Sequence, residues 1–111
     1  MAKKLAHDLK EYEKKLRSSK KTHEVYYTFI RGKKLSMGIQ ILKKGEDYGE
    51  PAHKNGEVYH ILKGRAKLRI GKKVYDVKPG MAMNIPPKVV HKFYDVKKEL
   101  LFMFIFAGFD D

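Results

Sequence analysis

The sequence predicts an all-β protein, an antiparallel sandwich or barrel, with one α-helix at the N-terminus. Several short segments alternate hydrophobic and polar residues, follow one another at spacings of about 8 to 12 residues, and are separated by Gly, Pro or Lys pairs. Only the N-terminal segment has the periodicity of a helix. The chain of 111 residues, 42% of them hydrophobic, is long enough for one domain with a core of its own.

The helix is expected within residues 3–17. Its apolar residues recur at steps of four, three and four: Leu5, Leu9, Tyr12 and Leu16. They form one narrow stripe, which is typical of a helix that covers part of a sheet rather than of a membrane or partner helix. We therefore expect residues 1–20 to pack on a domain formed by residues 21–111.

The strands are expected to begin with a hairpin. Residues 25–30 are rich in β-branched and aromatic side chains, Arg31-Gly32-Lys33 interrupts them, and residues 35–41 then alternate. Further strands are expected at residues 58–62, 66–70, 74–77, 81–85, 89–95 and 100–106. The last strand is apolar on both faces, so the helix or a second copy of the chain must cover one face, and we expect a homodimer.

Composition excludes several kinds of site. The chain has no cysteine, which excludes disulfides, cysteine-bound zinc, the usual iron–sulfur clusters and a thiol nucleophile, so any metal must be held by nitrogen and oxygen. The longest apolar stretch, residues 100–109, is about half of the roughly 20 residues that a membrane helix needs. No apolar signal segment follows Lys3 and Lys4. We therefore expect a soluble, cytoplasmic protein.

The formal net charge is +12, from 25 Lys and Arg against 13 Asp and Glu. Lysine pairs lie mostly at the ends of the expected strands, where the chain turns through solvent, and no stripe collects them. No zinc-finger, helix-turn-helix or aromatic RNA-binding signature accompanies them. A solvated surface is the favoured interpretation, and no nucleic-acid or membrane partner is expected.

The strongest chemical signal lies in residues 51–64. In a straight strand, His53 and Glu57 would share a face but lie about 13 Å apart, too far for one metal ion. Between them, Asn55-Gly56 is a strong hairpin signal, because both residues accept positive φ. A tight turn there would pair Lys54 with Glu57 and bring His53 to roughly 5 to 7 Å from Glu57, so that both side chains reach one ion.

A third ligand is expected from residues 86–95. Val89, His91 and Phe93 share one face of that segment, which is apolar apart from the imidazole. A lone histidine in such a place is more often a core residue than a ligand, but three groups from two segments favour a metal site. His53, Glu57 and His91 would form a two-histidine, one-carboxylate set that leaves open positions for water or substrate.

These two segments resemble the two motifs of the cupin family. In motif 1 a histidine precedes the glutamate by four positions and the glutamate precedes a glycine by seven, as do His53, Glu57 and Gly64. Residues 79–91 and the Asp95 that follows them are similar to motif 2. The chain departs from the family pattern at Pro51 in place of the first histidine, Lys88 in place of a glycine, and Asp95 in place of an asparagine.

The resemblance implies a jelly-roll β-barrel that binds a divalent metal ion (Fe, Mn, Ni or Zn) and a small organic molecule, as a metal-dependent dioxygenase or isomerase. Glu57 would instead act as a catalytic general base if no metal binds. A non-catalytic small-molecule-binding or sensor module, with or without metal, is the alternative, because this fold hosts enzymes and non-enzymes alike.

Further residues are candidates for the pocket. Four of them could equally be core residues: Gln40, Tyr59, Met83 and Phe93. Lys54 and Lys88 are expected to flank one rim of the barrel and receive a substrate carboxylate, the alternative being two solvated turn lysines. His60 should face away from Glu57 unless a bulge reverses the register.

Overall fold

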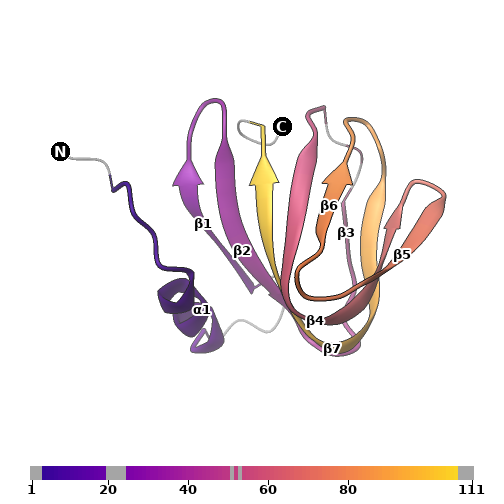
Figure 1. Cartoon of the computed structure of the whole chain (residues 1–111), viewed down its shortest axis with the longest axis horizontal. Helices are drawn as coiled ribbons and strands as arrows, with labels where there is room; N and C mark the ends of the chain where they lie inside the picture. Colours follow the sequence, from indigo (N-terminus) through magenta and orange to yellow (C-terminus); the bar gives the residue numbers. More distant parts are fainter. Residues whose placement is uncertain (1–3, 20–24, 51, 53, 108–111) are drawn as a thin grey trace.

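The computed structural model describes residues 4–19, 25–50, 52 and 54–107, which form one α-helix and a seven-stranded antiparallel sheet (Figure 1). The elements are α1 (Leu9–Arg17), β1 (Val25–Arg31), β2 (Ser36–Leu42), β3 (Tyr48–Glu50), β4 (Glu57–Ile70), β5 (Lys73–Val77), β6 (Ala82–Ile85) and β7 (His91–Phe106). The strand order is β1-β2-β7-β4-β5, with β3 paired to β7 and β6 paired to β4. The predicted class, mainly antiparallel β with an N-terminal helix, is confirmed.

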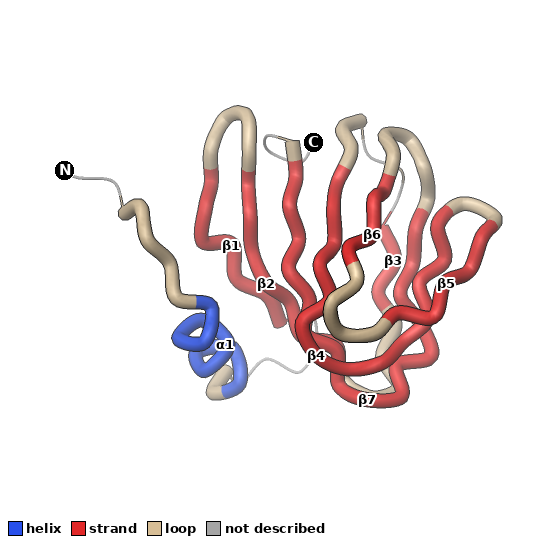
Figure 2. Tube along the Cα trace, viewed as in Figure 1, coloured by secondary structure: helices blue, strands red, loops and turns tan. Residues whose placement is uncertain are grey.

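The long strands β4 and β7 shape the molecule. They pair from Glu57 and Phe106 at one end to Ile70 and His91 at the other. Both bend at the base of the molecule, so that the sheet curls back on itself around an interior (Figure 2). The pairing shifts register between Ile61 and Lys67, and such bulges bend a strand and increase its twist.

Four of the expected strands are merged into these two, so the prediction of separate strands was wrong there. Lys63-Gly64 and Lys97-Lys98 stand between expected strands in the sequence, but they lie inside β4 and β7, close to the bend. Gly64 has a φ of 97°, and a Cβ at this position would lie 2.2 Å from the carbonyl oxygen of Glu99. The glycine therefore permits a bend with close backbone approach rather than a chain reversal.

Strand β3 was not expected from the sequence. It has three residues, and it pairs with β7 through Tyr48 opposite Phe93 and Glu50 opposite His91. Three residues are too few for an alternating pattern to be visible. The pairing brings the chain back beside His91 just before it continues to β4.

The sheet has an apolar core on each face. The inner core is enclosed by the curled sheet and includes Tyr59, Ile61, Leu68, Phe93, Leu100 and Phe102. The outer core lies beneath α1 and contains Tyr12, Leu16, Val25, Ile39, Ile41 and Leu101. Because successive side chains of a strand point to opposite faces, residues 100–104 of β7 contribute alternately to the inner and the outer core.

Helix α1 covers part of the outer face, as predicted, but it starts later than the apolar stripe suggests. The side chain of Asp8 caps the helix by accepting a hydrogen bond of 3.0 Å from the backbone N–H of Lys10. Leu5, the first residue of the stripe, precedes this cap and is 86% exposed. No helix within the described ranges is long and apolar enough to cross a membrane.

Charged side chains hold α1 against the bend. Glu13 Oε2 lies 2.8 Å from Arg17 Nε and 2.9 Å from Lys63 Nζ of β4, and Arg17 also pairs with Glu99 of β7. Burial raises the pKa of Glu13, but the hydrogen bonds from Lys63 and Arg17 outweigh burial and leave this pKa below its ordinary value. The hydrogen bonds to Glu99 and Glu13 raise the pKa of Arg17.

Candidate functional site

Glu57 and His91 meet in the interior of the curled sheet. Glu57 is the first residue of β4 and His91 the first of β7, yet they lie at opposite ends of the β4–β7 ladder. The bend of both strands brings these ends together, so that His91 Nε2 lies 2.9 Å from Glu57 Oε1. The two side chains are 2% and 1% exposed. The structure thus unites two of the three predicted ligands, while His53 lies outside the described residues.

The other ring nitrogen of His91 is occupied by the backbone. His91 Nδ1 lies 3.1 Å from the carbonyl oxygen of Val89. In a neutral imidazole, the Nδ1–H would donate to this carbonyl and leave the lone pair of Nε2 directed at the carboxylate of Glu57. Two electron-pair donors at this distance, shielded from water, can either share a proton or bind one cation together.

The surroundings of this pair are mostly aromatic and apolar. The Tyr59 ring lies 5.7 Å from the His91 ring and 5.0 Å from the ring of Phe93. Met83 lies beside Tyr59 in the β4–β6 ladder and is also buried. These three candidate pocket liners therefore belong to the inner core next to the pair.

Two further polar groups are buried on the inner face of β2. Gln40 and Ser36 are 4% and 3% exposed. Within the part of the chain that the structure describes, Gln40 Nε2 and Ser36 Oγ have no hydrogen-bond partner. Ser36 stands opposite Phe106, which is in turn opposite Glu57, so the hydroxyl is on the same side of the sheet as the carboxylate. Sequence analysis selected Gln40 but missed Ser36, because a serine at a strand end gives no signal of its own.

A hollow of about 410 Å³ opens from the surface to Glu57. Its lining is mainly apolar and includes Leu35, Pro86, Pro87, Ile105 and Phe106. One lysine, Lys34 of the β1–β2 turn, contributes to it, and nothing in its sequence context distinguishes it from other turn lysines. Lys54 and Lys88 are exposed and do not line this hollow.

The hairpin predicted at Asn55-Gly56 does not form as expected. Glu57 pairs with Ile85 of β6 on one edge of β4 and with Phe106 of β7 on the other. The backbone of Glu57 is therefore paired with a strand on each side, and Lys54 cannot form a further ladder with it. The link from Glu50, opposite His91, to Glu57 is the segment that contains His53.

The orientation predicted for His60 is confirmed. Glu57, Tyr59 and Ile61 are buried in alternation with the half-buried Val58 and His60. The register shifts of β4 start only after Ile61, so no bulge turns His60 inward.

Two of the departures from the cupin motifs lie where the backbone has positive φ. Lys88 has a φ of 64° and Asp95 a φ of 50°. A lysine in this region is strained, which explains why a glycine suits the position of Lys88. Asp95 tolerates it better, because Asp and Asn both visit the left-handed region. Neither residue takes part in the contact between Glu57 and His91.

Among the residues that the structure describes, no three His, Asp or Glu side chains are grouped so that they could hold a metal ion. The pair Glu57–His91 is therefore the donor set that these residues provide. A complete metal site would need further ligands, either from a residue outside the described ones or from molecules other than the protein.

Known proteins share this architecture. The family model for the cupin domain matches residues 38–106. The uncharacterized protein SCO3923 of Streptomyces coelicolor is 29% identical over 82 residues, which are 74% of this chain and 78% of that protein. The crystal structure of TT1209 from Thermus thermophilus has a TM-score of 0.75 at 18% identity and covers 93% of this chain and 96% of its own.

A cupin superfamily protein from Desulfitobacterium hafniense has a TM-score of 0.73 at 15% identity, with coverage of 83% of this chain and 84% of that one. At such identities the structural likeness shows the fold alone. The family match spans both motif segments, the strands that carry Glu57 and His91, and the bend between them. The chain belongs to the cupin family.

Proposed function

We propose that this cupin holds a divalent metal ion (Fe, Mn, Ni or Zn) at Glu57 and His91, with His53 as the third ligand, and binds a small organic molecule beside it. The observation that carries the proposal is the 2.9 Å contact between His91 Nε2 and Glu57 Oε1. Two donors that each lie about 2.1 Å from one ion at a right angle are about 3 Å apart. Imidazole nitrogen and carboxylate oxygen are ligands that these metals accept.

The backbone contact of the His91 ring supports the same proposal. A ligating histidine normally donates its other N–H to a carbonyl or carboxylate, which sets the tautomer and the ring orientation. Here the Val89 carbonyl is placed to accept that hydrogen bond. His91 is thereby oriented to use Nε2 toward Glu57.

When bound, the metal would supply a Lewis acid with open positions for substrate or dioxygen. The chain's own residues would do the rest. The buried rings of Tyr59 and Phe93 keep water from the pair, while Gln40 Nε2 offers a donor to a substrate oxygen. The proposed activity is that of a metal-dependent dioxygenase or isomerase, and Glu57 is the proposed catalytic residue, which would act as a general base if no metal binds.

The proposed substrate is a small carboxylate-bearing molecule. The hollow at Glu57 is mainly apolar and has Lys34 in its lining, which suits an apolar body with one negative group. Lys54 and Lys88 lie outside the lining of the hollow, on exposed segments that adjoin β4 and β7, and we propose that they flank one rim of the barrel and attract the carboxylate from there. The neutral amide of such an acid should bind more weakly than the acid itself.

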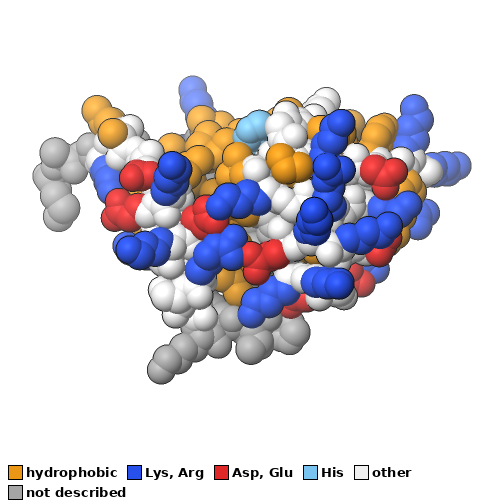
Figure 3. Space-filling model, turned by 60° about the horizontal axis from the view of Figure 1, so that its bottom comes forward, with side chains coloured by type: hydrophobic (Ala, Val, Ile, Leu, Met, Phe, Trp, Pro, Cys, Tyr) orange, Lys and Arg blue, Asp and Glu red, His pale blue; other side chains and the backbone are white. Residues whose placement is uncertain are grey.

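We also propose a homodimer formed through the outer sheet face. Next to the core beneath α1, this face carries Val58, Leu62, Met103 and Ile105, all half-buried, around His60. Hydrophobic side chains with a histidine among them are visible at the surface in Figure 3, whereas Lys and Arg are spread over the rest of that view. Each chain has a net charge of +12, and a contact through an uncharged face brings the fewest like charges close together. Light scattering at micromolar concentration should give twice the chain mass, and a monomer would contradict the proposal.

Metal analysis after reconstitution with each of the four metals tests the metal site. About one ion per chain is expected for the wild type, and clearly less for His91→Ala and Glu57→Gln. His60→Ala is the matched control, because His60 lies on β4 but faces away from Glu57. Substoichiometric metal in the wild type, or an unchanged content in His91→Ala, would overturn the proposal. Ligand binding without turnover by the loaded protein would favour the non-catalytic sensor instead.

A further inference from the structure

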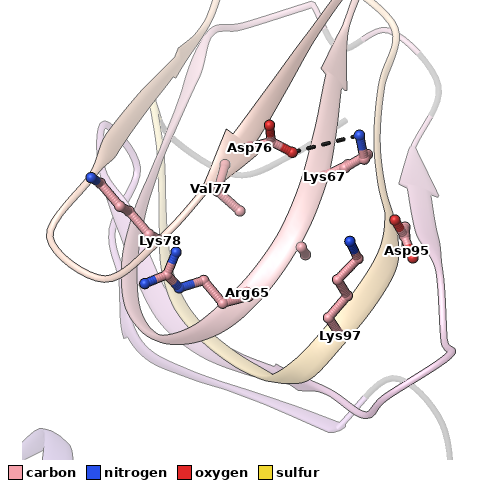
Figure 4. A pocket seen from close by; sticks show the side chains of 8 residues that line it. Arg65, Lys67, Asp76, Val77, Lys78, Asp95 and Lys97 are labelled. Atoms are coloured by element: carbon pink, nitrogen blue, oxygen red, sulfur yellow. Dashed lines mark ion pairs between the residues drawn. The ribbon is translucent and has the colours of Figure 1, made fainter.

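A second hollow, of about 490 Å³, lies across β4, β5 and β7 and shares no residue with the Glu57–His91 site (Figure 4). Its residues are Arg65, Ala66, Lys67, Asp76, Val77, Lys78, Asp95 and Lys97. The two apolar members, Ala66 and Val77, stand opposite each other in the β4–β5 ladder and are buried. Their side chains belong to the inner core, so the hollow is lined mainly by charged side chains, and its volume is within the usual size range of small-molecule sites.

A bulge in β7 builds one wall of this hollow. Arg65 pairs with Lys98 and Lys67 with Tyr94, so residues 95–97 of β7 lie opposite the single residue Ala66. Within the bulge, Val96 is buried in the inner core while Asp95 and Lys97 are exposed. The positive φ of Asp95 is part of this local geometry. The charged side chains thus reach the hollow because of a backbone feature and not by chance placement on a flat strand.

The charges around the hollow are unbalanced. Four cations face two carboxylates. One pair is internal, since Lys67 Nζ lies 3.6 Å from Asp76 Oδ1 (dashed line in Figure 4). Arg65, Lys78 and Lys97 make no side-chain ion pair or hydrogen bond with any other described residue. Asp95 is the single carboxylate left to offset these three cations.

We propose that this hollow is a second binding site, for a small dianion such as a phosphomonoester or a dicarboxylate. Three cations around one concave surface raise the local concentration of anions. The guanidinium of Arg65 can bind a phosphate or a carboxylate through two parallel hydrogen bonds, while the lysines act as point charges. The net excess of two positive charges, after Asp95 is counted, matches a dianion better than a monoanion. The site does not depend on the metal proposal.

Titration of the full chain, followed by NMR chemical shifts of backbone amides, tests the site. Inorganic phosphate is the probe for phosphomonoesters, succinate is the probe for dicarboxylates, and acetate is the monoanion control. We expect saturable shifts at residues 65–67, 76–78 and 95–97 with at least one dianion, and weaker binding of acetate. Absence of saturable shifts there with both dianions would overturn the proposal.

Variants separate a built site from the effect of net charge. The double variant Arg65→Gln, Lys97→Gln should bind the dianion about tenfold more weakly, because it loses two solvent-exposed ion pairs with the ligand. Lys14→Gln with Lys33→Gln removes the same charge from exposed positions outside the hollow and should change affinity less than about twofold. Asp95→Asn should strengthen binding, because it removes the opposing carboxylate while Asn accepts the same φ. Equal weakening in both double variants, or no gain with Asp95→Asn, would refute the site.

Discussion

The α-carbon of Gly64 lies so close to the backbone of Glu99 that an added Cβ would be 2.2 Å from the Glu99 carbonyl oxygen. This contact lies where β4 and β7 bend, between the ends of the strands that carry Glu57 and His91. The close approach of two backbones at the bend therefore underlies the geometry of the site, although neither residue belongs to it.

Replacement of Gly64 should destabilise the protein at the bend. Gly64→Ala combines a strained φ of 97° with a clash against backbone, which cannot move aside as a side chain can. We expect a loss of more than about 2 kcal/mol in the free energy of unfolding, measured by urea denaturation. Gly80→Ala is the control, because its φ of 94° is similar but nothing lies within 4 Å of the new Cβ. Gly80→Ala should lower the free energy of unfolding by only about 1 kcal/mol. An equal loss in the two variants would show that the clash at Gly64 is relieved.

The strained lysine of motif 2 offers a stabilising substitution. Lys88 is exposed and has a φ of 64°, so Lys88→Gly should relieve strain and raise the stability by about 0.5 to 1 kcal/mol. Lys88→Ala keeps the strained backbone while removing the charge, and it should not stabilise the protein. Thermal denaturation of the three proteins compares them directly. A gain of the same size in both variants would assign the effect to charge repulsion.

The contacts of Glu13 should make the stability depend on pH. The pKa of Glu13 is lowered from 4.5 in the folded protein, so its contribution is fully present above that value and is lost as the pH falls through the lower folded pKa. Glu13→Gln should therefore be less stable than wild type at pH 7, by about 1 kcal/mol. The difference should disappear once the pH lies below the folded pKa of Glu13.

Glu11→Gln is the matched control for this effect, because Glu11 is on the same helix but exposed and has no ion pair with another described residue. It should change the stability by a few tenths of a kcal/mol through the helix dipole alone. Urea denaturation at several pH values measures both variants. If the gap between wild type and Glu13→Gln were independent of pH, the ionic contacts would not be its cause.

Metal binding at Glu57 and His91 should appear as thermal stabilisation. A ligand that binds only the folded state stabilises it by about 2.7 kcal/mol at one hundred times its dissociation constant. Excess metal should raise the Tm of the wild type and of His60→Ala, and a chelator should lower it again. His91→Ala should show no such rise. A rise of equal size in His91→Ala would place the ion elsewhere.

The side chains that face the interior could be predicted from the sequence. A period of two assigns Glu57, Tyr59 and Ile61 to one face and His60 to the other, and this assignment depends only on the pleat of a strand. The same holds for His91 and Phe93, which are buried on either side of the exposed Lys92. The chemical character of the site, an imidazole and a carboxylate among aromatic rings, was therefore predictable from local pattern.

The pairing of the strands could not be predicted from the sequence. The sequence around Lys63-Gly64 and around Asn55-Gly56 has the same local signature as a turn, yet the first is a bulge within one long strand. At the second, both edges of Glu57 are already paired with β6 and β7, so no hairpin ladder can form on it. Strand pairing depends on backbone groups that are far apart in sequence, and local composition does not record which of them meet. The 2.9 Å approach of His91 to Glu57 is such an outcome, since it follows from the bend of two paired strands and not from any spacing along the chain.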